Sequence, residues 1–307
     1  KMRQIRFDNK VVIVTGAGSG LGRSYAIALA SRGAKVLIND LGSSLDGSGR
    51  SVNIASNVAK EIVESGGEAL ADNSDVTDKK SVDKMIKKVL SAWGRVDVLV
   101  NNAGILRDKS FSKITIEDFK AVVDVHLNGS MICSKAVWDY MKKQKSGNII
   151  MTTSSSGLYG NFGQSNYGSA KMGVIGLMNV LAIEGEKYGI VVNAISPTAS
   201  TRMTKNILES EILNLLDVES VTAALIYLAS EFSKTRTILA AGAGGYAVSR
   251  ILETEGIYLS PDDQSPENIH KNFSKIIDSH NAQYLSQGWM QTMKFVKKAA
   301  NHLKITI

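Results

Sequence analysis

The sequence predicts an α/β fold, in which a doubly wound parallel sheet carries helices on both faces and is followed by a C-terminal extension. Short runs of β-branched apolar residues alternate with longer stretches of helical character, which is the pattern of parallel strands joined by crossover helices. The first run, residues 10–15 (KVVIVT), leads directly into a glycine-rich turn and then into a helix that ends near Ser31. Ligands of such folds bind at the carboxyl ends of the strands, so residues that follow strands are candidates for a binding site.

The glycine-rich turn, residues 16–22 (GAGSGLG), is predicted to bind the pyrophosphate of a dinucleotide, because it places backbone N–H groups and a helix N-terminus against a phosphate. The next predicted strand, residues 35–39, ends at Asp40. A carboxylate there can accept hydrogen bonds from both ribose hydroxyls of NAD and would repel the 2′-phosphate of NADP. No basic residue follows Asp40 directly, and Ser19 rather than lysine or arginine precedes Gly20. We therefore predict NAD over NADP, with an aspartate that only caps a loop as the alternative.

The elements after Asp40 continue the alternation. A polar, glycine-rich loop over residues 41–51 is long for a connection between a strand and a helix. After this loop we expect a helix over residues 56–65, a strand over 68–73, a helix over 79–93, and strands over 96–100, 148–153 and 191–195. The fold should then gather, at one edge of the sheet, four polar residues that follow strand ends: Asp40, Asp75, Asn102 and Ser154.

Residues 154–171 (SSSGLYGNFGQSNYGSAK) carry the candidate acid/base group. Tyr167 and Lys171 are four residues apart at the start of a predicted helix, so both side chains project from one face. The Lys171 ammonium would favour the phenolate of Tyr167 and lower its pKa, while Ser154 could hold the same substrate oxygen. A Tyr-x-x-x-Lys pair alone is often only a solvated tyrosine and lysine on a surface helix. Its agreement with the glycine-rich turn favours acid/base chemistry.

The composition limits the class of protein. The 307 residues, 44% hydrophobic and 21% charged, suffice for one large core. The single cysteine, Cys133, excludes an internal disulfide, and no cysteine cluster indicates a metal site. We expect an intracellular, soluble chain, because no apolar run approaches a membrane span and residues 1–10 lack a signal-peptide core. The net charge of +7 comes from scattered basic residues, which disfavours nucleic acid as a partner and suits a polyanionic small molecule.

In combination and in this order, the motifs resemble those of the short-chain dehydrogenase/reductase family, which has a Rossmann fold. They are TGxxxGxG at residues 15–22, NNAG at 101–104, Ser154 with Tyr167 and Lys171, and Pro197 after the last predicted strand. Further stretches resemble the (3R)-hydroxyacyl-CoA dehydrogenase domains of peroxisomal multifunctional enzymes of type two: NNAGILRD at 101–108, VHLNG at 125–129, GLYGNFGQ at 157–164 and TRMT at 201–204. The resemblance runs from about Ile5 to at least Tyr258.

The resemblance implies a role for each matching residue. Tyr167 would be the general acid/base, Ser154 would hold the reacting oxygen, and Lys171 would tune Tyr167 and bind the nicotinamide ribose. His126 stands where the wider family usually has a catalytic asparagine, so it is either a proton relay or a histidine that only fixes a helix bend. The pyrophosphate of the cofactor would contact Gly16, Ser19, Gly20 and Leu21, its adenosine ribose Asp40, and its adenine Asp75 and Val76. The nicotinamide ribose would lie against Asn102, Ala103, Gly104, Tyr167 and Lys171. The nicotinamide ring would be covered by Pro197, Thr198, Ala199, Ser200 and Thr201.

The activity implied by the resemblance is NAD-dependent oxidation of (3R)-3-hydroxyacyl-CoA to 3-ketoacyl-CoA in peroxisomal fatty acid β-oxidation. Two alternatives remain open: a steroid dehydrogenase or ketoacyl reductase of the same fold, and a nucleotide-binding protein without catalysis. Residues 305–307 do not form a peroxisomal targeting tripeptide, so the peroxisomal location is implied by the resemblance alone.

The chain is expected to contain a dehydrogenase domain over residues 5–250 and an extension over 251–307 that ends in a basic amphipathic stretch. The extension could contact a partner subunit, shape an acyl-CoA channel, or link to a fused or associated enoyl-CoA hydratase domain. Residues 172–189 form a predicted helix that is apolar on nearly every side, with Gly173 and Gly176 permitting close approach. Such a helix needs burial on two faces. The resemblance implies that it pairs with its copy in a second subunit, so we expect a homodimer, with burial inside one chain as the alternative.

Overall fold

The computed structural model describes residues 4–200 and 209–306. Contacts within the chain divide it into two units, one that ends at Val248 and one that begins at Ser249. The boundary expected from the sequence, between residues 250 and 251, lies close to this division.

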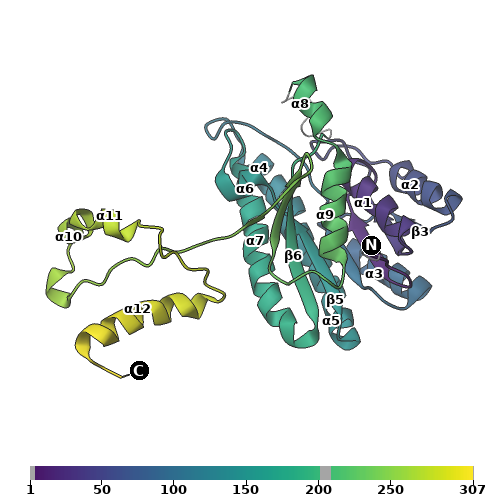
Figure 1. The fold of residues 1–307 in the computed structure, drawn as a ribbon. Helices are drawn as coiled ribbons and strands as arrows, with labels where there is room; N and C mark the ends of the chain where they lie inside the picture. Colours follow the sequence, from purple (N-terminus) through teal and green to yellow (C-terminus); the bar gives the residue numbers. More distant parts are fainter. Residues whose placement is uncertain (1–3, 201–208, 307) are drawn as a thin grey trace. The chain divides into compact units, whose positions relative to one another are not determined.

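The first unit is built on an eight-stranded sheet with the strand order β3-β2-β1-β4-β5-β6-β7-β8 (Figure 1). The pairs from β3 through to β7 are parallel. The chain reverses its direction of travel across the sheet between β1 and β4, which is the point where doubly wound folds form their binding crevice. The strands are β1 Val11–Thr15, β2 Lys35–Asn39, β3 Glu68–Asp72, β4 Val98–Asn101, β5 Gly147–Thr152, β6 Ile190–Pro197, β7 Ile238–Gly242 and β8 Gly245–Ser249.

Helices follow most of the strands. In the first unit they are α1 Gly20–Ser31, α2 Asn53–Glu64, α3 Lys79–Trp93, α4 Ile116–Val123, α5 Gly129–Gln144, α6 Ser155–Tyr159, α7 Ser165–Gly185, α8 Ser210–Leu215 and α9 Val218–Ala229, with a π-helical turn at Asp124–Asn128 and a 3₁₀ turn at Glu186–Tyr188. The second unit contains α10 Pro266–Lys271, α11 Phe273–Ile276, α12 Gly288–Leu303 and a 3₁₀ turn at Pro261–Asp263.

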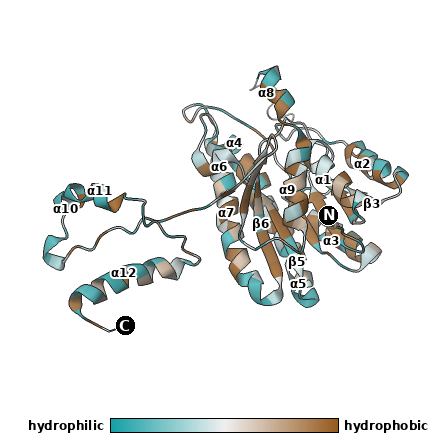
Figure 2. Cartoon of the chain, viewed as in Figure 1, coloured by the Kyte–Doolittle hydropathy of each residue, from teal (hydrophilic) through white to brown (hydrophobic). Residues whose placement is uncertain are grey.

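Two hydrophobic cores lie on opposite faces of the sheet. One core packs α1, α2 and α9 against the strands, and the other packs α3, α5 and α7 against them. Along β1, Val12 and Val14 belong to the first core, while Val11 and Ile13 belong to the second, as the two-residue period of a strand requires. The strands are accordingly hydrophobic along their length, and the outer helices carry hydrophilic faces (Figure 2). A sheet buried on both faces confirms the predicted doubly wound fold.

Predicted elements agree with the structure except at their ends. The strand over residues 35–39 and the helix over 79–93 have the predicted bounds. The helix expected from residue 56 begins earlier, at Asn53, and the strand expected over 191–195 extends over β6, Ile190–Pro197. Helix and strand ends are the positions that local patterns define least well.

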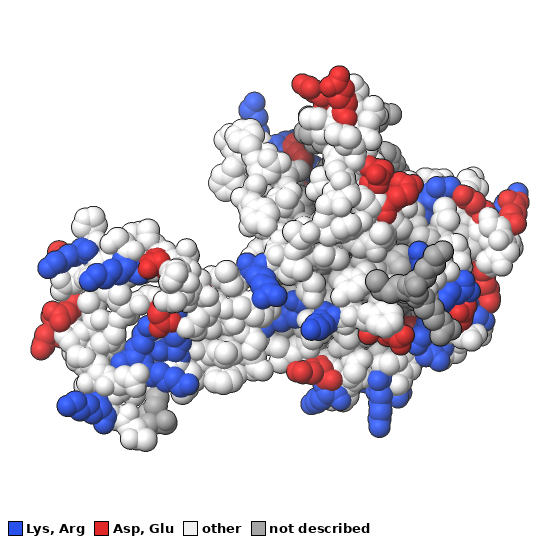
Figure 3. Space-filling view, in the orientation of Figure 1, with Lys and Arg blue, Asp and Glu red and all other residues white. Residues whose placement is uncertain are grey.

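Charged side chains are interspersed on the surface of the first unit. On the face drawn in Figure 3, Lys and Arg alternate with Asp and Glu and form no continuous basic patch. In the second unit two lysines of α12 pair with acidic residues of an extended segment: Lys294 with Glu253, at 3.1 Å, and Lys298 with Glu255. The basic face of this helix is therefore partly neutralised inside its own unit.

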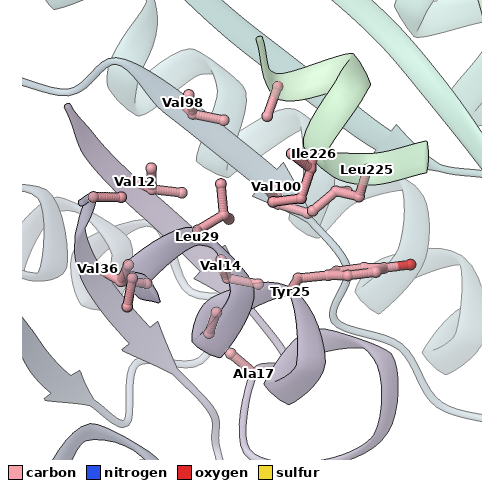
Figure 4. Close-up of a cluster of buried hydrophobic side chains, with 14 of the residues drawn as sticks. Val12, Val14, Ala17, Tyr25, Leu29, Val36, Val98, Val100, Leu225 and Ile226 are labelled. Carbon is pink, nitrogen blue, oxygen red and sulfur yellow. The ribbon is translucent and has the colours of Figure 1, made fainter. Parts of the chain in front are cut away.

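One described stretch, residues 210–229, is long and apolar enough to cross a membrane, where no such stretch was expected from the sequence. In the structure the stretch forms two helices, α8 and α9, and the side chain of Asp217 caps α9 by accepting a hydrogen bond from Ser220 N at 2.8 Å. Figure 4 shows Leu225 and Ile226 of α9 packed beside Val100 and near the side chain of Tyr25. We therefore assign α9 as a core helix of the first unit.

Candidate active site

A cavity of about 420 Å³ lies at the carboxyl ends of the strands in the first unit. The first turn of α1, the loops after β2, β3 and β4, and the start of α7 contribute its walls. Thirteen of the residues predicted to bind a dinucleotide line it: Gly16, Ser19, Gly20, Leu21, Asp40, Asp75, Val76, Asn102, Ala103, Gly104, Tyr167, Lys171 and Pro197.

The glycine-rich turn is shaped by close backbone contacts. Gly16 has a φ of +63°, and a Cβ atom there would lie 2.7 Å from Ala103 Cα. Gly22 would place a Cβ atom 2.2 Å from Gly16 O. Asn102 holds the turn, because its side-chain amide donates to Thr15 O and Gly16 O at 3.0 Å each. Only glycine fits these positions, and the cradle that results fits a pyrophosphate at the N-terminus of α1.

Asp40 ties the glycine-rich turn to the following loop. Its Oδ2 accepts a hydrogen bond from Gly18 N at 2.8 Å, and its Oδ1 accepts one from Gly42 N at 2.7 Å. Each carboxylate oxygen has a second lone pair, so the oriented group can still accept from ribose hydroxyls. Asp75, across the cavity, accepts hydrogen bonds from both the backbone N and the hydroxyl of Thr77.

The three candidate acid/base residues lie close together in the structure. Ser154 follows β5 and caps α6, with Ser156 N donating to its Oγ at 3.2 Å. The Ser154 hydroxyl lies near enough to the phenol of Tyr167 to favour its ionised form. The Nζ of Lys171 lies 5.5 Å from the centroid of the Tyr167 ring and donates to Thr152 O at 2.6 Å. All three side chains therefore meet beside the end of β5.

The expected lowering of the Tyr167 pKa is wrong for this structure. Burial raises the pKa of Tyr167 above its ordinary value, and the Ser154 hydroxyl opposes this shift only in part. Burial also lowers the pKa of Lys171 to about 7. An ammonium so near its pKa is charged for only part of the time at neutral pH, so its effect on the phenolate is weaker than that of a fully charged lysine.

His126 is buried, with 2% of its surface exposed, in the π-helical turn at Asp124–Asn128. Its Nε2 lies 2.8 Å from Ile105 O and 3.1 Å from Ile105 N, and its ring meets the Tyr167 ring edge-on at 5.0 Å. A Cβ atom on Gly104 would lie 2.3 Å from the His126 ring, so a glycine there makes room for it. Burial holds the pKa of His126 well below its ordinary value. The ring is therefore neutral and held by the backbone of Ile105; a proton-relay role remains a prediction.

The segment after β6 matches the prediction less closely. Pro197 lines the cavity, whereas Thr198, Ala199 and Ser200 are not among the described lining residues. Thr198 N donates to Ala241 O, Ser200 N donates to Leu216 O, and Ala199 is buried in the core of α1 and α9. Thr201, the last residue predicted to cover nicotinamide, lies outside the described residues.

Sequence reasoning missed one wall of the cavity. The loop after β2 contributes Leu41, Ser43, Ser44, Leu45 and Gly47 to this wall, and the segment after β4 contributes Ile105 and Arg107. The unusual length and glycine content of residues 41–51 were the available signal. Thr152 was also missed: its buried Oγ1 has no hydrogen-bond partner among the described residues, and the residue lines the same cavity.

Comparisons with known proteins agree with this geometry. The family model for short chain dehydrogenases matches residues 10–212. Peroxisomal multifunctional enzyme type 2 of Mus musculus is 45% identical over 281 residues, which are 91% of this chain and 38% of that protein. Peroxisomal hydratase-dehydrogenase-epimerase of Saccharomyces cerevisiae is 47% identical over 277 residues, 89% of this chain and 31% of that protein. The chain thus spans about a third of the length of these relatives.

Two solved structures share the fold. The full-length peroxisomal multifunctional enzyme type 2 from Drosophila melanogaster superposes with a TM-score of 0.80 at 38% identity, covering 97% of this chain and 51% of that one. A 7α-hydroxysteroid dehydrogenase complexed with NADH superposes with a TM-score of 0.70 at 29% identity, covering 78% of this chain and 95% of that one. The resemblance therefore extends over most of this chain.

Proposed function

The chain belongs to the short-chain dehydrogenase family, and from this membership we propose that it oxidises (3R)-3-hydroxyacyl-CoA with NAD⁺ to 3-ketoacyl-CoA in fatty acid β-oxidation. The observation that carries the proposal is one cavity that joins the glycine-rich turn and Asp40 to Tyr167 and Lys171, with the Ser154 hydroxyl near the phenol of Tyr167. The turn's close contacts and the orientation of Asp40 fit a nicotinamide dinucleotide. The names of the mouse and yeast relatives support the choice of a peroxisomal dehydrogenase reaction.

The chemistry divides between the cofactor and the chain. Nicotinamide, when bound, supplies the hydride acceptor. Tyr167 takes the proton of the substrate hydroxyl as a general base, and Ser154 holds the same oxygen through its hydroxyl. Lys171 favours the phenolate whenever its own ammonium is protonated. The His126 ring packs edge-on against Tyr167 and the Ser154 hydroxyl lies near its phenol, so the chain orients Tyr167 before the transition state forms.

A panel of substrates tests the substrate class. We expect NADH formation from a 3-hydroxyacyl-CoA, and no comparable rate with a hydroxysteroid or with 3-ketoacyl carrier protein and NADPH. A faster rate with the hydroxysteroid would instead indicate a steroid dehydrogenase, and a faster rate with 3-ketoacyl carrier protein would indicate a ketoacyl reductase. A protein that binds NADH and turns over none of the three would be a nucleotide-binding protein without this catalysis.

Asp40 is expected to set the preference for NAD. In Asp40→Asn the negative charge is removed and one oxygen remains to accept from Gly18 N or a ribose hydroxyl, so the KM for NAD⁺ should rise about tenfold. The relative rate with NADP⁺ should rise by at least a similar factor, because a 2′-phosphate no longer meets a carboxylate. Initial rates with both cofactors measure the change. Asp83→Asn is a matched control on the exposed face of α3, and a preference for NADP⁺ in the unmodified protein would contradict the role of Asp40.

A homodimer is proposed from the outer face of α7. Val180 is 53% exposed, Met172 and Ile183 are 39% exposed each, and a Cβ atom on Gly176 would meet open space. These residues continue the helix that carries Tyr167 and Lys171, so a second copy packed on this face would rest on the back of the active site. Sedimentation at micromolar concentration should give twice the 33.0 kDa mass of one chain. Replacing Val180 with glutamate should produce the monomer, whereas a 33.0 kDa species in the unmodified protein would exclude the dimer.

The remaining assignments rest on the relatives. A peroxisomal location and a hydratase domain, fused or associated, are proposed because the mouse and yeast proteins are named as peroxisomal and multifunctional or hydratase-containing, and are longer than this chain. Consecutive hydration and dehydrogenation would pass a hydroxyacyl-CoA directly to this active site.

A further inference from the structure

The loop over residues 41–51, here called the strap, is an ordered element. Asp46 Oδ1 accepts three hydrogen bonds, from Ser44 Oγ at 2.9 Å, Ser48 N at 2.9 Å and Ser48 Oγ at 2.7 Å. The bonds from Ser48, the backbone bond first, hold the pKa of Asp46 at about 2. The two ends of the loop are also joined, because Ser51 N donates to Leu41 O at 3.4 Å. A loop with this many internal bonds moves as a unit.

The strap reaches from β2 to the residues that follow β4. Leu45 O accepts a hydrogen bond from Leu106 N at 2.9 Å. Gly47 has a φ of +86°, and a Cβ atom there would lie 3.2 Å from the side chain of Ile105. Between these two contacts, Asp46 O accepts a hydrogen bond from Arg107 Nε at 2.9 Å. The strap therefore joins two walls of the cavity, the loop after β2 and the residues after β4. The glycine-rich turn and Tyr167 line the other walls.

Arg107 connects the strap to the rest of the site. Its Nη1 donates to Asp118 Oδ1 of α4 at 3.2 Å, and Lys109 Nζ donates to the other oxygen of Asp118 at 2.8 Å. The backbone O of Arg107 accepts from Asn166 Nδ2 at 3.0 Å, one residue before Tyr167. The Arg107 side chain is 31% exposed and the Asp118 side chain 17% exposed, so water screens this pair less than an ordinary surface pair.

We propose that Arg107 is a positioning residue that fastens the strap across the bound dinucleotide and thereby sets the rate at which the dinucleotide leaves. The inference rests on the proposed function in one respect, that the cavity binds a nicotinamide dinucleotide. The strap and the glycine-rich turn line the same cavity, so a dinucleotide held at the turn would lie against the strap, and we expect its departure to require movement of the strap. The hydrogen bonds to Leu45 O and Asp46 O, and the packing of Gly47 against Ile105, are the interactions that must open.

The strap also reaches the reacting group through packed residues. Gly47 lies against Ile105, the backbone of Ile105 holds the His126 ring, and that ring meets Tyr167 edge-on. Fastening the strap thus fixes the position of Ile105, whose backbone holds the His126 ring against Tyr167. Through these contacts, the release of the dinucleotide is coupled to the mobility of the Tyr167 side chain.

The test is the dissociation rate of NADH, followed by its fluorescence when a stopped-flow mixer adds excess NAD⁺ to the preformed complex. Arg107→Met keeps the aliphatic stem and removes the donors to Asp46 O and Asp118. We expect release about tenfold faster, which corresponds to the loss of one hydrogen bond from a charged donor. Arg6→Met is the matched control, because it removes an exposed arginine bonded to Asp8 outside the cavity. The dissociation rate is a property of the folded complex alone, so partial unfolding of the variant does not change it.

A second variant tests the strap from its other side. Gly47→Ala adds a methyl group where the strap meets Ile105 and strains a positive φ, so it should also speed the release of NADH, with Arg107 intact. If NADH binds and both variants release it at the unmodified rate, the strap inference is overturned and the proposed function stands. If the unmodified protein binds neither NADH nor NADPH, the proposed function fails and the strap inference fails with it.

Discussion

Replacing Tyr167 with phenylalanine is expected to abolish oxidation of 3-hydroxyacyl-CoA while leaving the affinity for NADH nearly unchanged. The variant loses only the phenol oxygen, which the site presents to the substrate together with Ser154. The ring remains to pack edge-on against His126, so the wall of the cavity keeps its shape. General acid/base catalysis is worth roughly 10² to 10⁴ in rate, and we expect a fall in kcat of about 10³ or more.

Initial rates and an NADH titration, run on the same preparation, separate the two effects. Tyr227→Phe serves as the matched control, because its hydroxyl lies on the partly exposed face of α9, outside the cavity. Substantial turnover by Tyr167→Phe would remove Tyr167 from the acid/base role. Loss of NADH binding would instead show that the phenol is part of the cofactor site.

Replacing Lys171 with methionine is expected to lower kcat about 10²-fold and, unlike the change at Tyr167, to weaken NAD⁺ binding as well. The ammonium favours the phenolate and is the implied ligand of the nicotinamide ribose, and methionine fills a similar volume without the charge. Measured kcat and KM for NAD⁺ give both effects. Lys79→Met, on the exposed face of α3, is the control.

The Lys171→Met variant should gain stability relative to the unmodified protein as the pH falls, because burial of the ammonium costs free energy, whereas the loss of the donor to Thr152 O acts at every pH. The cost of burial appears as the lowered pKa of about 7. Between this value and the ordinary lysine value the unfolded chain holds a proton that the folded chain has lost, so the stability of the unmodified protein rises with pH. The advantage of the variant is therefore greatest below about pH 7 and fades as the pH increases. Unchanged NAD⁺ affinity in a stable variant would contradict the ribose contact.

Local chemistry explains why much of the fold and the site could be predicted. Gly22 is required by its contact with Gly16 O in the same strand-to-helix turn, and Gly16 has a positive φ there; such local requirements leave a sequence pattern. The position of Asp40 follows from the length of one βαβ unit. Tyr167 and Lys171 share a helix face because they are four residues apart. Each of these features depends on spacing along the chain, which a sequence displays directly.

Features that depend on distant parts of the chain were not predictable in the same way. Arg107 and Asp46 are 61 residues apart, and the His126 ring is held by a backbone 21 residues away. The pKa values of Tyr167 and Lys171 follow from burial, which is a property of the assembled core. Sequence reasoning placed the lysine beside the tyrosine and gave the wrong direction for the tyrosine pKa, because it could not weigh desolvation against charge.

The most direct test of the proposed reaction is the rate of NADH formation from the separated R and S forms of one 3-hydroxyacyl-CoA, with NAD⁺ and NADP⁺ in parallel. We predict turnover of the R form with NAD⁺ and rates at least about tenfold lower for the other three combinations, since a difference of that size needs only about 1.4 kcal/mol. Turnover of the S form at a rate comparable to that of the R form, or a preference for NADP⁺, would contradict the proposed reaction.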